Sequence, residues 1–386
     1  MLEDASLLPA IVHIREAERH AHPLMAETKY PWLPQLLYRG QLLGSLEYIR
    51  ELCLTMSGHD TAAPSRRDSH SSLPSDASPI WSIAADGPFA LSASADGVLR
   101  KWTCPPDAEP QVRERLQLSS GWLTSVCLID GMSAVAAESR GALYVVDVQP
   151  LRVRAVIETG DAWINAVDFD RTTATLVSAA DVGSVRTWKL RGDGLELCQH
   201  LELDLGWVNS VACSKATAWL ASASGSVARI HLDRPGKPAY ASSLVSRAGL
   251  NSLDLGGGVA VVAGQEGVPI FINEALEREA SGAGRHSSPI WGTRFSSGGD
   301  VVSIDALGTA IFHLPDGGSL AVHNDEPLIA LSRSSPGTRI YAGTRHGNLI
   351  PMEADGQVRR SPSHESQPST RSGHKSAPSA NQMLEH

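Results

Sequence analysis

A repeat of about forty residues constrains the fold of this chain more than any other feature. Seven short phrases, such as those at 122–126 and 207–211, align on one apolar anchor residue. The anchors, 38 to 44 residues apart, are Ile80, Leu123, Ile164, Val208, Leu250, Ile290 and Leu328. A glycine keeps the same register at Gly97, Gly141, Gly183, Gly225, Gly267, Gly308 and Gly347. Two separate markers in one register over seven units indicate a true repeat.

The period and the pattern inside each unit predict β-strands. Four-stranded propeller blades repeat every 40 to 45 residues, whereas common helical repeats take 33 or 34. In the third unit, the apolar runs 163–167, 175–179 and 185–188 are typical of strands, with a tight turn at 181–183. The glycine of each unit suits a turn that needs a positive φ. We therefore expect an all-β fold, a seven-bladed β-propeller.

Segments 90–102 and 206–211 resemble the repeats of the WD40 family, and the resemblance extends over residues 79 to about 353. It implies a WD40-type propeller, a fold that supports many functions. The chain departs from the family pattern, because the third-strand tryptophan survives only as Trp102 and Trp188 and the Trp-Asp and Gly-His pairs are missing. We therefore expect the family's Trp-Ser/Thr-His-Asp hydrogen-bond network to be absent and apolar packing to hold the blades together.

Three other segments flank the propeller, which we place at 79–355. Residues 1–56 form a predicted N-terminal helical extension, 57–78 a flexible linker, and 356–386 a disordered tail whose last three residues resemble the start of an affinity tag. The extension has an apolar stripe at three- and four-residue steps, comprising Leu36, Leu43, Leu46, Ile49 and Leu52. This predicts a docking helix that packs on the propeller or binds a partner. Segments 69–76 and 357–360 are alternative strands for closing the ring.

Composition restricts the partners and the compartment. Thirty-three basic and 42 acidic residues give a net charge of -9, which argues against a polyanion as the main partner. Five scattered cysteines without a C-x-x-C pair suggest neither disulfides nor zinc. There is no apolar run long enough for membrane insertion and no signal-peptide pattern at the start. We expect an intracellular protein of the cytoplasm, with the nucleus as the alternative, and its oligomeric state stays open.

The sequence predicts no catalytic, cofactor-binding or metal-binding residues. It has no Walker loop, H-E-x-x-H or G-x-S-x-G motif. Asp168 and Asp170 would point to one face of a strand, which is only a weak indication of paired carboxylates. A non-enzymatic scaffold or adaptor for protein–protein interactions is therefore the first hypothesis. The alternatives are a hydrolase-like propeller with a site in its channel and a nucleic-acid-binding propeller.

Tryptophans and asparagines cluster around the anchors. In WD40 propellers the residues flanking the anchor lie near the channel mouth on the top face, a common site for partners. Trp122, Trp163 and Trp207 precede three anchors, and the residues that follow anchors include Trp81, Trp291, Asn165, Asn209 and Asn251. Rigid aromatic side chains beside amides are typical of peptide-binding surfaces. If they bind a partner, the first three tryptophans should be partly exposed; the alternative is that they pack between blades.

Two serines outside the repeat are candidate phosphorylation sites. Ser69 follows Arg66 and Arg67, and Ser361 follows Arg359 and Arg360. A phosphate on either serine could pair with the neighbouring arginines. Both lie in segments that we expect to be disordered.

Overall fold

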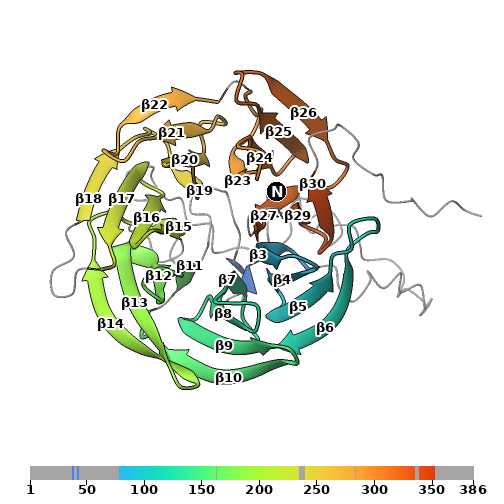
Figure 1. The fold of residues 1–386 in the computed structure, drawn as a ribbon, viewed down its shortest axis with the longest axis vertical. Coiled ribbons are helices and arrows are strands. Elements are labelled where there is room, and N and C mark those ends of the chain that lie inside the picture. Colours follow the sequence, from blue (N-terminus) through green and yellow to red (C-terminus); the bar gives the residue numbers. More distant parts are fainter. Residues whose placement is uncertain are drawn as a thin grey trace, which may run out of the picture.

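Seven sheets surround a central axis in the computed structural model (Figure 1). The structure describes residues 78–352 except 162, 234–239, 283 and 335–338. It also gives the backbone of two short paired strands, β1 (Leu37–Tyr38) and β2 (Gln41–Leu42). The predicted seven-bladed β-propeller is confirmed. Apart from β1 and β2, which are strands, the predicted N-terminal helical extension lies outside the described residues, and so do Ser69, Ser361 and both candidate closing strands; these stay predictions.

Each blade is antiparallel, and its strands are numbered from the channel outwards. Blade one contains β3 (Ile80–Asp86), β4 (Phe89–Ser94), β5 (Val98–Thr103) and β6 (Gln111–Gln117). Blade two contains β7 (Leu123–Leu128), β8 (Ser133–Glu138), β9 (Ala142–Val148) and β10 (Leu151–Glu158). Blade three contains β11 (Ile164–Asp170), β12 (Thr175–Ala180), the 3-10 turn η3 (Asp181–Gly183), β13 (Ser184–Arg191) and β14 (Gly194–Glu202).

The other four blades repeat this order. Blade four contains β15 (Val208–Ser214), β16 (Thr217–Ser222), β17 (Ser226–His231) and β18 (Tyr240–Leu244). Blade five contains β19 (Leu250–Gly256), β20 (Val259–Gly264), β21 (Ile270–Ile272) and β22 (Arg278–Ser281). Blade six contains β23 (Ile290–Phe295), β24 (Val301–Asp305), β25 (Thr309–His313) and β26 (Ser319–His323). The described part of blade seven contains β27 (Leu328–Leu331), β29 (Ile340–Thr344) and β30 (Leu349–Met352).

The seven predicted anchors are the first residues of the seven innermost strands, and each is at most 1 % exposed. A β-bulge follows every anchor, because the pairing register shifts between the anchor and the residue two positions on. A bulge leaves one residue out of the ladder and redirects its side chain. The residue directly after each anchor is therefore the bulge residue, which has no paired residue on the neighbouring strand.

The seven repeated glycines have positive φ values, as the turn argument predicted. A second constraint acts at most of them, because the chain leaving the outer strand passes close to the glycine. A Cβ atom on Gly141 would lie 1.9 Å from the carbonyl oxygen of Asp161, and one on Gly183 would lie 1.9 Å from that of Leu203. These turns therefore require glycine for both conformation and space.

Blades one and seven close the ring by packing and by one short parallel pairing. Strand β28 (Arg333–Ser334) pairs in parallel with β3, and an apolar cluster joins Ile80 and Ile83 of blade one to Tyr341 of blade seven. Gly343 on β29 lies so close to blade one that an added Cβ would be 2.7 Å from Cγ2 of Ile80. The junction therefore depends on a small residue at position 343.

We predict that Gly343→Val lowers the free energy of unfolding by about 1 to 3 kcal/mol, because the new side chain would overpack this junction. Thermal unfolding of the full chain measures the change. Gly131→Val is the matched control, since nothing lies within 4 Å of a Cβ atom there. Equal melting temperatures for the two variants would contradict a tight junction.

The expectation that the WD40-like polar network would be absent is wrong for blade six. His286 Nδ1 lies 2.8 Å from Asp305 Oδ2, and its Nε2 lies 2.8 Å from Ser303 Oγ. Ser303 Oγ is also 2.8 Å from His313 Nε2, and all four side chains are buried. His313 occupies the register position of the missing tryptophan. A histidine thus completes the network where the sequence comparison expected an indole.

The surroundings of His313 keep its ring neutral. Burial, together with the nearby charge of His286, lowers the pKa of His313 from 6.5 to about 4. Burial alone would raise the pKa of Asp305, but hydrogen bonds from His286 and from the Thr309 backbone bring that pKa below its ordinary value. The folded network therefore favours a neutral His313 and a charged Asp305.

We predict that acid destabilises the protein partly through His313. Between pH 6.5 and about 4 the unfolded chain binds a proton at this residue and the folded chain does not, so stability falls as the pH falls, by at most roughly 3 kcal/mol. His313→Phe should flatten this part of the curve of melting temperature against pH. His323→Phe, at an exposed position, should leave it unchanged. An identical slope in wild type and His313→Phe would refute the assignment.

Candidate binding site at the channel mouth

The seven bulge residues, one directly after each anchor, lie around one cavity on the propeller axis. The cavity has a volume of about 80 Å³ and is lined by residues of all seven innermost strands. The bulge residues among them are Trp81, Thr124, Asn165, Asn209, Asn251, Trp291 and Ile329. The predicted arc of amides at the channel mouth therefore exists, and the bulges explain why these side chains reach the axis.

Hydrogen bonds from these side chains link neighbouring blades. Thr124 Oγ1 donates to the carbonyl of the next anchor, Ile164 (2.6 Å). Nδ2 of Asn209 and of Asn251 likewise donates to the next anchor carbonyl, over 2.8 Å in each case. The carbonyls of these three anchors, Ile164, Leu250 and Ile290, are thus satisfied by a side chain from the preceding blade.

A second row of contacts lies one residue further along the inner strands. The hydroxyl groups of Ser82, Ser125, Ser210 and Ser252 each accept a backbone N–H from the next blade at 3.0 or 3.1 Å. Apolar packing is therefore only part of what holds the blades together. The sequence prediction that cohesion rests on apolar contacts was incomplete, because the partners are backbone groups about forty residues away.

Asn165 is the exception among the three asparagines. Its side chain is 1 % exposed, yet neither its Nδ2 nor its Oδ1 has a hydrogen-bond partner among the described residues. Position 166, where four other blades carry the serine of the second row, is alanine. The junction of blades three and four thus leaves a complete carboxamide group beside the cavity.

Three tryptophans form a row across blades one to three. The Trp81 and Trp122 rings stack with centroids 5.8 Å apart, and Trp122 meets Trp163 edge to face at 5.9 Å. Trp122 is partly exposed, as expected, whereas Trp163 and Trp207 are only 8 % and 4 % exposed, so the expected exposure is wrong for these two. Trp163 and Trp207 serve mainly as packing residues, whereas Trp81 and Trp122 are the partly exposed members of the row.

Buried polar pairs support the same three blades. The third residue after the repeated glycine is Arg100, Tyr144 and Arg186 in blades one to three, but Ala228, Ile270, Ile311 and Ile350 in the others. Arg100 pairs with Asp96, and the Tyr144 hydroxyl donates to Glu138 over 2.5 Å. Burial, followed by the contact with Glu138, raises the pKa of Tyr144 to about 12. Sequence analysis missed these pairs, although this register column shows the change in residue type.

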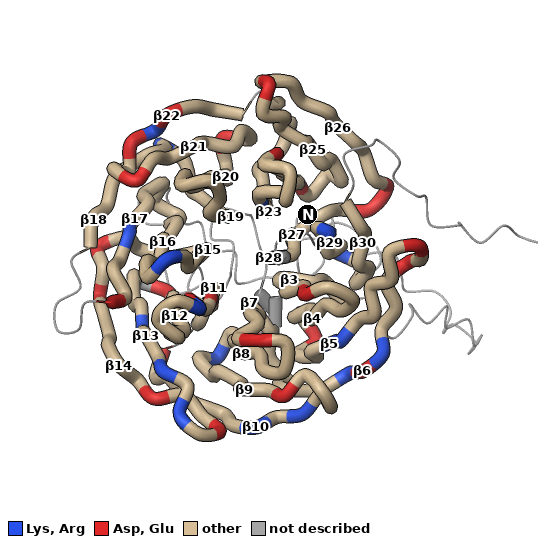
Figure 2. The backbone as a smooth tube through the Cα atoms, in the orientation of Figure 1, with Lys and Arg blue, Asp and Glu red and all other residues tan. Residues whose placement is uncertain are grey.

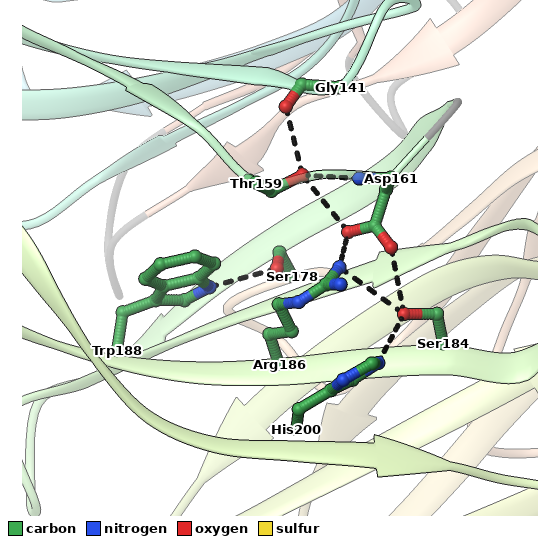
Figure 3. Close-up of polar contacts among 8 residues, drawn as sticks. All are labelled: Gly141, Thr159, Asp161, Ser178, Ser184, Arg186, Trp188 and His200. Atoms are coloured by element: carbon green, nitrogen blue, oxygen red, sulfur yellow. Dashed lines mark hydrogen bonds and ion pairs between the residues drawn. The ribbon is translucent and has the colours of Figure 1, made fainter.

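The pair in blade three belongs to a network of polar contacts around Asp161 (Figure 3). Arg186 forms an ion pair with Asp161, whose carboxylate also accepts bonds from Thr159 (3.0 Å) and Ser184 (2.9 Å). Ser184 in turn contacts His200 at 3.1 Å. Burial lowers the pKa of the Arg186 guanidinium. The network ties the exit of blade two to blade three, two residues before Trp163.

The opposite end of the channel opens into a cavity of about 630 Å³ that contains carboxylates. Asp168 Oδ2 accepts the backbone N–H of Cys213 (2.6 Å), and Asp254 Oδ2 accepts that of Phe295 (2.9 Å). Asp170 bonds Thr173 and the backbone of Ala216. These carboxylates thus join blades, and the described residues include no group of three or more potential metal ligands.

Charged residues of both signs are spread around the ring (Figure 2). In the described part of the chain, no helix is long and apolar enough to cross a membrane.

The chain matches no model of a known protein family, and no curated protein matches it either. Fold and site together define a seven-bladed β-propeller with an amide-lined channel mouth and a tryptophan row beside it.

We predict that Arg186→Met lowers the free energy of unfolding by about 3 kcal/mol, because it leaves the buried Asp161 carboxylate without its cation. Arg191→Met is the matched control on the same strand; its pair with Glu196 is largely exposed and contributes at most about 1 kcal/mol. Denaturant unfolding of the full chain measures both. A similarly small loss of unfolding free energy for the two variants would show that the ion pair of Arg186 with Asp161 does not stabilise blade three.

Proposed function

We propose that this protein is a WD40-type scaffold or adaptor, without enzymatic activity, that binds a protein partner at the channel mouth of blades one to three. The observation that carries the proposal is the tryptophan row, in which Trp81 lines the amide-lined cavity and the partly exposed Trp122 stacks on Trp81. Aromatic residues with fixed geometry provide large contact areas at low entropic cost.

The family assignment is supported by the His286, Ser303 and Asp305 contacts in blade six, which use the residue types of the WD40 network. The four described cysteines are free thiols, which supports an intracellular location, in the cytoplasm or the nucleus. The predicted helix with Leu36, Leu43, Leu46, Ile49 and Leu52 would be a second docking element, and the oligomeric state is left open.

A protein partner is favoured over the two alternatives. A hydrolase-like channel site needs ionisable groups free to converge on a substrate, whereas Asp168 and Asp254 accept backbone N–H groups. A nucleic acid needs a concentrated basic face on its protein partner, whereas the net charge here is -9 and charges of both signs are spread around the ring.

We predict that Trp122→Ala weakens partner binding by about 2 kcal/mol, roughly thirtyfold in affinity, with little change in melting temperature. The full chain is immobilised, bound proteins are identified by quantitative mass spectrometry, and the affinity of each is then measured. Tyr240→Ala removes an aromatic residue that is 48 % exposed on the outer strand β18 and is the matched control. Equal losses for both variants, or no loss for Trp122→Ala, would refute this binding face.

A further inference from the structure

The carboxamide of Asn165 is an unusual group to find in a protein interior. It is 1 % exposed and lines the cavity at the channel mouth, while both its donor and its acceptor lack protein partners among the described residues. A buried polar group without a partner costs about 1 to 3 kcal/mol. An occupant of the cavity that supplies both an acceptor and a donor would recover that cost.

Neighbouring groups restrict the chemistry of this occupant. The Oδ1 atoms of Asn209 and Asn251 are buried and have no donor among the described residues, so the arc presents three amide oxygens in consecutive blades. Arg294 lines the same cavity and carries a positive charge, which disfavours a cation. An anion would in turn meet the three amide oxygens. A neutral group with donors and an acceptor suits both sets of neighbours.

The size and the walls of the cavity agree with such a group. A volume of about 80 Å³ exceeds the 10 to 15 Å³ that one water molecule needs several times over. Trp81 and Trp291 also line the cavity and can contact an apolar stem. The cavity therefore fits a short side chain with an apolar stem and a polar planar end.

We propose that the channel mouth binds a primary carboxamide, namely the side chain of a glutamine or asparagine that a partner inserts along the axis. Asn165 pairs with it through two hydrogen bonds, as one amide pairs with another, and the Oδ1 atoms of Asn209 and Asn251 accept its remaining N–H. This inference rests on the proposed function in one respect only, namely that the carboxamide comes from a partner protein.

Propionamide, which reproduces the end of a glutamine side chain, tests the site in the full chain. Titration followed by NMR should shift the side-chain NH₂ signals of Asn165, Asn209 and Asn251. Propionate lacks the donors, and butanone replaces the NH₂ by a methyl group, so each should bind roughly tenfold more weakly. Unshifted signals, or equal binding of the three compounds, would overturn the proposal.

Variants assign the binding to Asn165. Asn165→Leu, of similar size, should abolish the propionamide shifts at Asn209 and Asn251 without loss of stability, because the amide makes no bond within the described protein. Asn165→Asp removes the donor and should also weaken binding. Asn348→Leu changes an exposed asparagine that contacts Glu326 outside the cavity, and binding should persist. Retained shifts in Asn165→Leu would contradict the site.

The two proposals fail in different ways. If propionamide binds through Asn165 but Trp122→Ala leaves protein binding unchanged, the carboxamide site is confirmed for a free small ligand and the proposed function is refuted. If protein binding depends on Trp122 while propionamide leaves the asparagine signals unshifted, the proposed function is supported and the carboxamide inference is refuted. In a captured partner, replacing the inserted glutamine by methionine should weaken binding roughly tenfold in the wild type and not in Asn165→Leu.

Discussion

The β-bulge after each anchor is the constraint on which the rest of the propeller depends. It allows the anchor side chain to be fully buried while the next residue turns towards the axis. From there Thr124, Asn209 and Asn251 reach the anchor carbonyls of the following blades. At these junctions side chains satisfy backbone groups that no strand pairing reaches, while blades seven and one are joined by apolar packing and by the parallel pairing of β28 with β3.

The ring is nevertheless asymmetric. In blades one to three, charged or hydroxyl groups occupy the third position after the repeated glycine, with buried partners such as Asp161 for Arg186, whereas blades four to seven have apolar residues there. The tryptophan row lies over the same three blades. A buried ion pair has one favoured geometry, so it fixes the loop carrying Trp163 more specifically than apolar contacts alone would. The tryptophan row and the buried polar pairs thus coincide on one side of the channel.

Blade six shows why resemblance to a repeat family is a partial guide. Without the typical tryptophan and the Gly-His pair, the sequence predicted no polar network, yet His313 takes the position of the indole and His286 completes the chain of contacts. Both rings meet Ser303, and a hydroxyl can donate to one nitrogen and accept from another. A hydrogen-bond network depends on where donors and acceptors lie in space, and different residue types can fill the same positions.

The sequence by itself determined the number of blades, the start of every innermost strand and the turn glycines, because these follow from local periodicity and backbone conformation. Together with the resemblance to WD40 repeats, it also placed Asn165, Asn209 and Asn251 at the channel mouth. Only the tertiary structure decided that Trp122 is partly exposed while Trp163 and Trp207 are buried, and that, of the three asparagines, Asn165 has no side-chain hydrogen-bond partner among the described residues. Those properties depend on contacts between blades, which join residues about forty positions apart, and no local pattern encodes the distance between such residues.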